Sequence, residues 1–406
     1  MRILHTSDWH VGRTLHGASL ESAHARFFDW LVETVKQEAV DAVIVAGDVF
    51  DRAVPPLEAV QLVDRVITAL SAHARVVLTP GNHDSALRLG FGQDWNGERV
   101  IVRSRVADVG QPVVLPKPDG QAGAVLFALP YLDPELARGQ LAHALAGREV
   151  ARSHEGVVAA AMEMVRAGHA RVDQDLPVVL VAHAFVAGGR ASDSERDIKV
   201  GGVDLVPSEV LVPPQGWQPD YVALGHLHRA QFVAGLDGGD GGSVVRYSGS
   251  PVAFSFSEAE DQKSVTIVEL DKRGAGVKIR VLSTPVERPL AVLTGQLAEL
   301  LGPAYAPFRE HYVSVEVTDR VRPAELVTRV KAVFPWALST QHKPVDALSQ
   351  SQVDLASRRA SRAQSNPVDV VGEFIAAVTG RGADAEIVSV IRESYESVRS
   401  RKAGTK

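Results

Sequence analysis

The sequence predicts an α/β fold, and three observations support that prediction. Several short, continuous apolar runs bounded by Gly or Pro are typical of strands buried on both faces of a sheet. Two stretches with helix-period apolar faces, residues 21–38 and 57–70, lie between the first of these runs. Strand, helix and strand in this order and at this spacing indicate parallel pairing, with the helices packed outside the sheet.

Five of the strand-like segments end in side chains that can bind a metal ion. They read RILHTSDWH, AVIVAGDVFDR, ARVVLTPGNHD, PVVLVAH and YVALGHLH. Because the loops that follow parallel strands gather at one edge of a sheet, we expect their polar residues to lie together. These residues are Asp8, His10, Asp48, Asn82, His83, His183, His226 and His228. One His after a strand is commonly a solvated residue, but five separate strands that end this way indicate a site.

The rest of the chain carries weaker patterns. Residues 100–130 contain a hairpin-like apolar stretch, and helices are expected around 134–147 and 153–168. From about residue 285 the order becomes strand, helix, strand, helix, strand, closing near His342. Residues 343–365 lack apolar periodicity and are expected to form a linker. Residues 366–400 then predict two short amphipathic helices, the first with an apolar stripe of Val368, Val371, Ile375 and Val378.

Composition bounds the class of protein. A chain of 406 residues predicts two or three domains, and 45% hydrophobic with 23% charged residues is typical of a soluble globular protein. The apolar runs are too short to span a bilayer, and the start of the chain lacks the layout of a signal peptide, so a cytoplasmic protein is expected. The absence of Cys excludes disulfides and thiolate metal sites. A net charge of −6 argues against coating nucleic acid by bulk charge.

A cluster of Asp, Asn and His side chains suits a pair of divalent metal ions. Two ions roughly 3.5–4 Å apart can stabilise both the attacking and the leaving oxygen of a phosphoryl transfer. A carboxylate must lie between them, because two close cations repel each other. Nitrogen and oxygen ligands without sulfur suit Mn, Fe or Zn better than Ca or Mg. The leaving oxygen needs a proton, so one imidazole should remain unligated as a general acid.

The five motifs resemble those of the calcineurin-like metallophosphoesterases. They are Asp8-x-His10, Gly47-Asp48, Gly81-Asn82-His83-Asp84, His183 and Gly225-His226-x-His228. The longer flanks HTSDWHVGRTLHG, DAVIVAGDVFDRAVPP and YVALGHLHRAQ look like the SbcD-type nuclease subunits, bacterial counterparts of the archaeal and eukaryotic double-strand-break repair nucleases. This resemblance covers roughly residues 1–285. It implies a four-layer α/β/β/α sandwich over residues 1–284, a small α+β capping domain over 285–342 and a C-terminal helical tail.

The resemblance also implies roles for the site residues. The first metal would be held by Asp8, His10, Asp48 and His228, and the second by Asp48, Asn82, His183 and His226. Asp48 would then bridge the two ions, and the two His of GHLH would serve different ions. His83 matches the general acid, and Asp51 matches an Asp that holds the acid imidazole in related phosphatases. Arg13 and Arg52 are candidate phosphate contacts, and Asp84 is expected to support a ligand.

For partners, the resemblance implies that the C-terminal tail binds an SbcC-like ATPase. It also implies a homodimer through helices near 57–70 and 86–93, within a heterotetramer that acts on DNA near the nucleoid. The function expected is a Mn²⁺-dependent DNA nuclease, 3′ to 5′ on duplex ends and endonucleolytic on hairpins and single strands. The alternatives are a phosphatase or cyclic-nucleotide phosphodiesterase with the same metals, and a scaffold without metals. No ligand of the set is missing, which argues against the scaffold.

Overall fold

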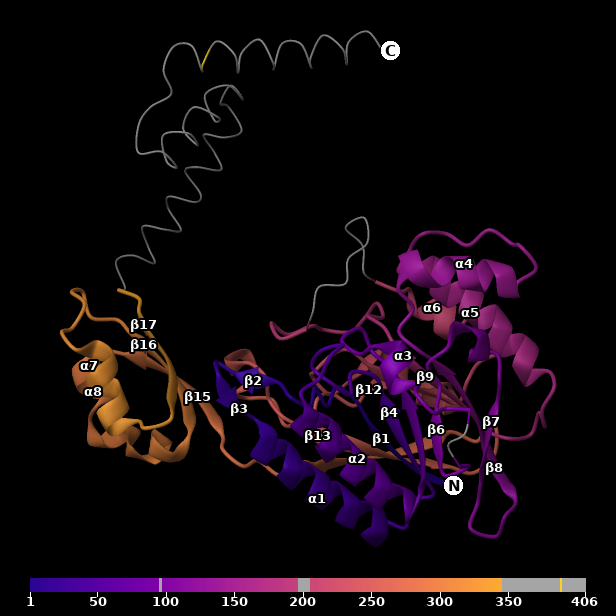
Figure 1. The fold of residues 1–406 in the computed structure, drawn as a ribbon, viewed down its shortest axis with the longest axis horizontal. Helices are drawn as coiled ribbons and strands as arrows, with labels where there is room; N and C mark the ends of the chain where they lie inside the picture. Colours follow the sequence, from indigo (N-terminus) through magenta and orange to yellow (C-terminus); the bar gives the residue numbers. More distant parts are fainter. Residues whose placement is uncertain (95–96, 196–204, 345–387, 389–406) are drawn as a thin grey trace. The chain divides into compact units, whose positions relative to one another are not determined.

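The computed structural model describes residues 1–94, 97–195, 205–344 and 388 (Figure 1). The chain divides into two compact units. The first comprises Met1–Leu293, Ala306–Ser314 and Val330–Ser339. The second comprises Thr294–Tyr305, Val315–Arg329 and the described residues from Thr340 onward. The residues that the sequence predicts for the metal site all fall in the first unit.

The first sheet contains the N-terminal strand and has six strands in the order β14-β13-β1-β4-β5-β6. Its strands are β1 (Arg2–Thr6), β4 (Ala42–Ala46), β5 (Arg75–Thr79), β6 (Val100–Val102), β13 (Ser264–Leu270) and β14 (Val277–Ser283). Strands β1, β4, β5 and β6 run parallel, and β13 and β14 add an antiparallel edge. The connecting helices are α1 (Glu21–Gln37), α2 (Leu57–Ser71) and the single turn α3 (Ala86–Leu89).

The second sheet also has six strands, in the order β11-β12-β10-β9-β8-β7. Its strands are β7 (Val113–Pro116), β8 (Ala122–Leu129), β9 (Val178–His183), β10 (Tyr221–Gly225), β11 (Gln231–Asp237) and β12 (Val244–Tyr247). The four central strands are parallel, and β7 and β11 close the edges in antiparallel pairing. Helices α4 (Pro134–Ala144), α5 (His154–His169) and α6 (Ser208–Leu211) belong to this half.

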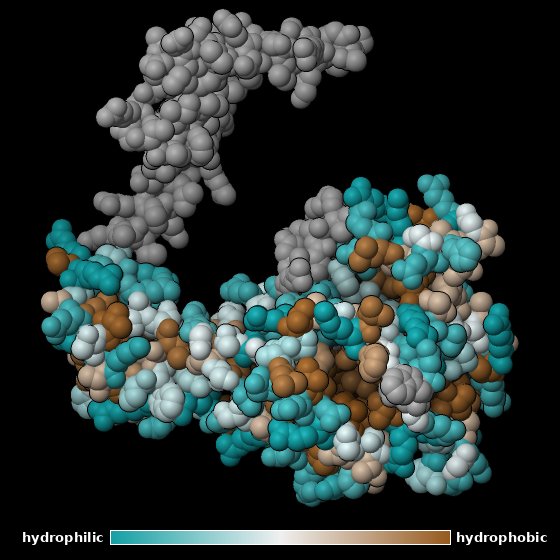
Figure 2. All heavy atoms as spheres, viewed as in Figure 1, coloured by the Kyte–Doolittle hydropathy of each residue, from teal (hydrophilic) through white to brown (hydrophobic). Residues whose placement is uncertain are grey.

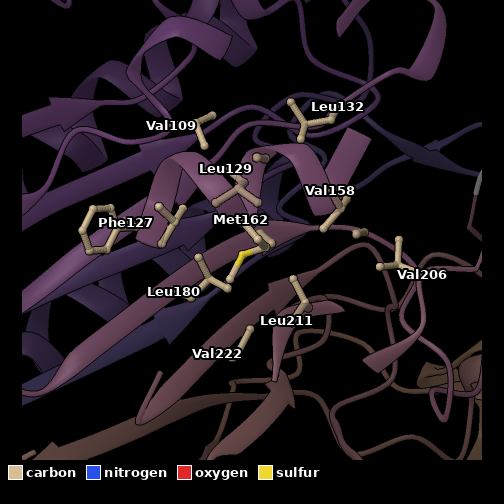
Figure 3. Packing of buried hydrophobic residues seen from close by; sticks show 14 of the residues in the cluster. Val109, Phe127, Leu129, Leu132, Val158, Met162, Leu180, Val206, Leu211 and Val222 are labelled. Carbon is tan, nitrogen blue, oxygen red and sulfur yellow. The ribbon is translucent and has the colours of Figure 1, made fainter. Parts of the chain in front are cut away.

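Three apolar cores stack these elements into four layers, as the family resemblance implies. Strand β4 illustrates the arrangement, because Val43 and Val45 join a core with α1 and α2 while Ile44 points to the opposite side. This alternation follows from the two-residue period of a strand. The middle core fills the space between the two sheets, and a third packs the second sheet against α4 and α5. Figure 3 shows part of this third core, with Met162 of α5 among side chains from the strands.

A third, smaller sheet follows in the sequence. It has the order β15-β16-β17, formed by β15 (Leu290–Gly295), β16 (Tyr312–Val317) and β17 (Ala337–His342). Helices α7 (Leu297–Leu300) and α8 (Leu326–Val333) alternate with these strands, which matches the order that the sequence predicts for residues 285–342. A 3₁₀ segment, Pro303–Glu310, and the short pair β2 (Thr14–Leu15) and β3 (Ala18–Ser19) complete the main regular elements.

The polarity of the described residues is that of a folded globular chain. Figure 2 shows mostly hydrophilic side chains on the face drawn, with apolar residues in smaller groups. Among the residues that the structure describes, no helix combines the length and the apolar character needed to cross a membrane. The helices predicted within 366–400, with Val368, Val371, Ile375 and Val378, lie outside the described residues apart from Val388. The linker predicted at 343–365 also lies outside them, apart from Lys343 and Pro344 at its start.

Candidate metal centre

The loops that carry the predicted ligands adopt an unusual backbone. Asp8, His10, Asp48 and His226 have φ angles of 53°, 44°, 49° and 105°. Residues other than Gly rarely adopt positive φ, and such strain persists where the surrounding structure imposes it. Here the loops after β1 and β4 hold each other, since the N–H of Asp8 donates to Gly47 O at 3.0 Å and that of His10 to Asp48 O at 2.9 Å. Four of the eight non-Gly residues with positive φ in the described part of the chain are ligand candidates.

The glycines beside these residues allow the loops to approach closely. A Cβ on Gly81 would lie 2.1 Å from Asp48 Oδ1, and one on Gly47 would lie 2.2 Å from His183 Nδ1. A Cβ on Gly225 would meet the main-chain oxygen of Ala46 at 1.8 Å. No side chain fits at these distances. The Gly residues of the motifs are therefore required because the ends of β4, β5, β9 and β10 meet at one point.

One group of ligand atoms gathers around His10. The Nε2 atoms of His10 and His228 lie 3.1 Å apart, and Nε2 of His10 lies 3.4 Å from Asp48 Oδ2. Asp8, His10 and His228 each offer a ligand atom within 4.8 Å of the others. These side chains are buried. Two imidazole nitrogens facing each other beside carboxylates suit a shared cation better than a direct contact.

A second group gathers around His183. Its Nε2 lies 3.4 Å from Asp48 Oδ2 and 3.0 Å from Asn82 Oδ1, which itself lies 3.2 Å from His226 Nδ1. Asp8, Asp48 and His183 also offer ligand atoms within 4.8 Å of one another. Asp48 Oδ2 is thus equally distant from His10 and His183. The same carboxylate faces both groups, as a carboxylate between two cations must.

The charges of this cluster favour cation binding. Burial raises the pKa of Asp8 to about 7, whereas the nearby His183 and His10 hold the pKa of Asp48 well below its usual value despite burial. Burial also opposes the charge on His183, but Asp48 outweighs it and raises the pKa of His183 to about 9. Without metal, one imidazolium therefore compensates the buried carboxylates. Two divalent ions would replace its proton and satisfy the remaining lone pairs.

Burial keeps the other imidazoles neutral. It lowers the pKa of His226 to about 3 and moves those of His10 and His228 well below their usual value. Neutral imidazole is the form that binds a metal ion. The donor set of neutral imidazoles, carboxylates and one amide oxygen therefore fits two divalent ions of the Mn, Fe or Zn type.

Asp84 supports the site from behind, as expected. Its carboxylate accepts hydrogen bonds from the N–H groups of Val49 at 3.0 Å, Phe50 at 2.9 Å and Gly81 at 2.9 Å. It thereby joins the loop that carries Asp48 to the loop that carries Asn82. Burial, with Asp48 adding to it, raises the pKa of Asp84 to about 7.

His83 lies at the site with a partner different from the one expected. Its Nδ1 lies 2.7 Å from the main-chain oxygen of Asp51, so the ring donates to a carbonyl and not to the Asp51 carboxylate. The Asp51 carboxylate lies 3.7 Å from His10 Nδ1 and 3.8 Å from Arg13 Nε. The His83 ring packs edge-on against His10, with ring centroids 4.6 Å apart. His83 also comes within ligand spacing of His10 and Asp48.

The two candidate phosphate contacts have different surroundings. Arg13 is largely buried, lies over the Phe254 ring at 4.8 Å and donates to the main-chain oxygen of Ser194 at 2.8 Å. Its guanidinium therefore ties the first motif to the segment around residue 194. Arg52 is exposed and lies 3.8 Å from the Asp51 carboxylate.

Comparisons with known proteins agree with this geometry. Residues 1–230 match the family model described as Calcineurin-like phosphoesterase, a range that contains every ligand candidate. The SbcD subunit of the nuclease SbcCD from Escherichia coli (strain K12) is 38% identical over 307 residues, which cover 74% of this chain and 72% of the relative. The chain belongs to the SbcD family of calcineurin-like phosphoesterases.

Two further similarities were found. The SbcD subunit of the nuclease SbcCD from Bacillus subtilis (strain 168) is 38% identical to this SbcD-family chain over 283 residues, 66% of each protein. A solved structure of TT1561 from Thermus thermophilus covers 69% of this chain and 98% of its own at 14% identity, with a TM-score of 0.39. As a family member, the chain is a metal-dependent phosphoesterase.

Several residues that contact His228 or lie beside it in this SbcD-family site were not predicted from the sequence. Ser194 Oγ lies 2.6 Å from His228 Nδ1, and Glu195 accepts the main-chain N–H of His228 at 2.8 Å. Lys263 and Glu258 form a buried ion pair directly behind His228. None of these residues lies in a metal-binding pattern or directly follows one of the five strands. A Ser, Glu or Lys in a loop carries no signal of such a role until the fold brings it to the ligand.

Proposed function

We propose that this chain is the nuclease subunit of a DNA-processing complex and hydrolyses phosphodiester bonds with two divalent metal ions, Mn²⁺ in the leading assignment. The observation that carries the proposal is the position of Asp48, whose Oδ2 lies 3.4 Å from both His10 and His183 in a chain 38% identical to the SbcD subunit of a nuclease. A complete ligand set on both sides of one carboxylate argues against a scaffold without metals.

The ligand assignment follows the two groups of side chains. Asp8, His10, Asp48 and His228 would hold one ion, and Asp48, Asn82, His183 and His226 the other. When bound, the ions supply charge stabilisation and an acidified water. Asp48 would contribute to both ion sites, and burial keeps His10, His226 and His228 in the neutral form that can bind a metal ion.

His83 is the proposed general acid. The Asp51 carbonyl occupies Nδ1 of His83, which leaves Nε2 as the atom that delivers a proton to the leaving oxygen of the DNA. The main-chain N–H of His83 donates to Asp48 Oδ1 at 2.9 Å. The proposed acid is therefore positioned by the same carboxylate that faces both groups of ligand atoms. Asp51 would act through its main chain. Arg13 and the exposed Arg52 remain candidate contacts for phosphate, and Arg13 also ties the first motif to Ser194.

Duplex ends, hairpins and single strands are the proposed substrates, with an SbcC-like ATPase as partner. The relatives are named as one subunit of the nuclease SbcCD, which supports the presence of a second subunit. The tail helices, with Val368, Val371, Ile375 and Val378, are the proposed contact. A chain truncated after Ser365 should then bind Mn²⁺ and cut single strands but fail to co-purify with the ATPase. Stoichiometric co-purification of the truncated chain would contradict this role for the tail.

The experiment that tests the nuclease function uses the pure full-length chain. Labelled duplex, hairpin and single-stranded DNA are incubated with Mn²⁺, with and without the ATPase. Cleavage of DNA that EDTA abolishes is the expected result, with 3′ to 5′ shortening of duplex ends. Hydrolysis of a small chromogenic diester without any cleavage of DNA would instead favour a phosphatase or cyclic-nucleotide phosphodiesterase.

A further inference from the structure

A closed chain of hydrogen bonds joins His228 to a carboxylate outside the five motifs. His228 Nδ1 lies 2.6 Å from Ser194 Oγ, which lies 2.9 Å from Ser192 Oγ. The Ser192 hydroxyl donates to Glu195 Oε2 at 2.8 Å. The other oxygen of Glu195, Oε1, accepts the main-chain N–H of His228 at 2.8 Å, so the chain returns to the residue where it begins. Ser194 and His228 are both buried.

The direction of this chain follows from the number of protons. A carboxylate only accepts, so the single hydroxyl proton of Ser192 points to Glu195. Ser192 Oγ must then accept the proton of Ser194, because two lone pairs facing each other at 2.9 Å would repel. With its own proton used, Ser194 Oγ can only accept from His228. The proton of the neutral His228 ring therefore lies on Nδ1, and Nε2 carries a lone pair.

That lone pair points to the place where the first metal ion is proposed. His228 Nε2 lies 3.1 Å from His10 Nε2, in the group completed by Asp8. In the described part of the chain, the Glu258 carboxylate also lies near His228 Nδ1, but its Oε1 is 4.0 Å away, beyond hydrogen-bond reach. A metal-binding imidazole generally donates the N–H of its other nitrogen to a carboxylate, a carbonyl or water, which fixes the tautomer. Here the hydroxyls of Ser194 and Ser192 connect the His228 ring to the Glu195 carboxylate, which fixes the tautomer through them.

We propose that Glu195, acting through Ser192 and Ser194, is a positioning group that holds His228 in the tautomer able to bind a metal ion. The proposal rests on the ligand role of His228 in the proposed function. Arg13 takes part by donating to the main-chain oxygen of Ser194 at 2.8 Å, which fixes the segment against the first motif. The segment Ser192–Glu195 thereby links the backbone, the ring orientation and the protonation of one ligand.

The isosteric change Glu195→Gln tests the direction of the chain. The two oxygens of Glu195 accept different main-chain N–H groups, that of His228 at 2.8 Å and that of Ser192 at 2.7 Å. An amide has one oxygen and one NH₂ group, so in either orientation its NH₂ group faces one of these N–H groups and the closed chain is broken. The proton of the His228 ring is then no longer held on Nδ1, and a proton on Nε2 would block the metal. Ser194→Ala removes the last link, and Ser194→Thr restores a hydroxyl.

The first measurement is the ¹⁵N spectrum of the imidazoles in the metal-free, full-length protein. The His228 signals are assigned by their loss in His228→Gln. We expect a proton on Nδ1 in the wild type and a shift toward the Nε2–H form in Glu195→Gln. A wild-type ring protonated on Nε2, or a spectrum unchanged in Glu195→Gln, would overturn the proposal.

The second measurement is Mn²⁺ binding by calorimetry, with electron paramagnetic resonance to detect coupled ions. Glu195→Gln and Ser194→Ala should weaken one of the two ions by about 10–100-fold, and Ser194→Thr should recover most of that loss. Glu209→Gln is the matched control, because Glu209 faces Ser208 in an exposed pair on α6, and it should bind both ions normally. If His228→Gln still binds two Mn²⁺ ions, the assignment of His228 as a ligand is refuted. If His228→Gln loses one ion but Glu195→Gln binds both normally, only the positioning role of Glu195 is refuted.

Discussion

The ammonium group of Lys263 donates a hydrogen bond to the main-chain oxygen of His228 at 3.0 Å. Lys263 also donates to Ser250 Oγ at 3.0 Å and to the Glu258 carboxylate, so all three of its protons are used inside the protein. His228 follows β10 of the second sheet, whereas Lys263 directly precedes β13 of the first. The contact therefore joins the two sheets at the metal site.

The first prediction concerns this buried pair. Lys263→Met leaves the Glu258 carboxylate buried without its partner, and breaking such a pair typically costs about 3–5 kcal/mol of unfolding free energy. Replacing both residues, in Lys263→Met with Glu258→Met, removes the stranded charge and should recover most of that stability. It should not recover normal metal affinity, because the His228 carbonyl still lacks its donor. Urea unfolding and Mn²⁺ titration of both variants check this. Equal stability of the single and double variants would contradict it.

The second prediction concerns Asp48. Asp48→Ala should abolish binding of both metal ions, because it removes the carboxylate that lies 3.4 Å from His10 and 3.4 Å from His183. The uncompensated cations would then repel each other. Calorimetry with Mn²⁺ measures the loss. Asp51→Asn is the neighbouring control and should still bind two ions. Two ions bound to Asp48→Ala at unchanged affinity would show that the site assignment is wrong.

The third prediction separates the acid from the ligands. His83→Gln should keep both metal ions and DNA binding but lose about 10²–10⁴ in cleavage rate, the usual cost of removing a general acid. Asp51→Asn keeps the carbonyl that holds His83 Nδ1, so it should lose much less. Single-turnover cleavage of labelled DNA in Mn²⁺ distinguishes the two. Near wild-type turnover in His83→Gln would exclude the acid role, and an equal loss in Asp51→Asn would restore the role of its carboxylate.

The ligand candidates could be predicted from sequence because each follows an apolar strand, and parallel strands bring their ends to one edge. Gly47, Gly81 and Gly225 added to that signal, since such residues allow backbones to meet. The helices at 21–38 and 57–70 were predicted for a similar reason, as each repeats apolar residues at helical spacing. Both are confirmed as α1 and α2.

The supports of the site could not be predicted in this way. Lys263 and Glu195 bind the main-chain oxygen and N–H of His228. Nearly every residue type has these main-chain groups, so the sequence at position 228 does not indicate such contacts. The partner of His83 shows the same limit. The family resemblance predicted a contact between His83 and the Asp51 carboxylate. His83 Nδ1 instead donates to the main-chain oxygen of Asp51, which any residue type would supply.

The fourth prediction is that metal loading releases protons. At pH 7 the raised pKa of His183, about 9, keeps it protonated in the metal-free protein, and Asp8 with a pKa of about 7 is partly protonated. Both must lose their protons to bind metal, so loading should release about one to two protons and the affinity should rise with pH. His226 contributes none, because its pKa is already about 3. Calorimetry in buffers of different ionisation enthalpy measures the release. No release at pH 7 would exclude His183 as a ligand.

The last prediction concerns the proposed homodimer. Large apolar side chains are exposed where α2 begins and around α3, and Leu57 and Leu87 keep 67% and 87% of their surface exposed. Arg88 joins the two regions by donating to the main-chain oxygen of Ala53 at 2.8 Å. Burying such side chains contributes roughly 1.5–3 kcal/mol each before ordering costs, which favours pairing of two copies through this surface.

Leu57→Asp combined with Leu87→Asp should convert the dimer to a monomer in sedimentation at micromolar concentration. Both side chains are exposed in the single chain, so the variant should fold and bind two Mn²⁺ ions normally. Leu136→Asp on α4 is the control, because that side chain is equally exposed but belongs to the other half of the body, and it should leave the dimer intact. A wild-type chain that stays monomeric even with the ATPase present would contradict the homodimer. A dimer that survives both Asp substitutions would show that the contact lies elsewhere.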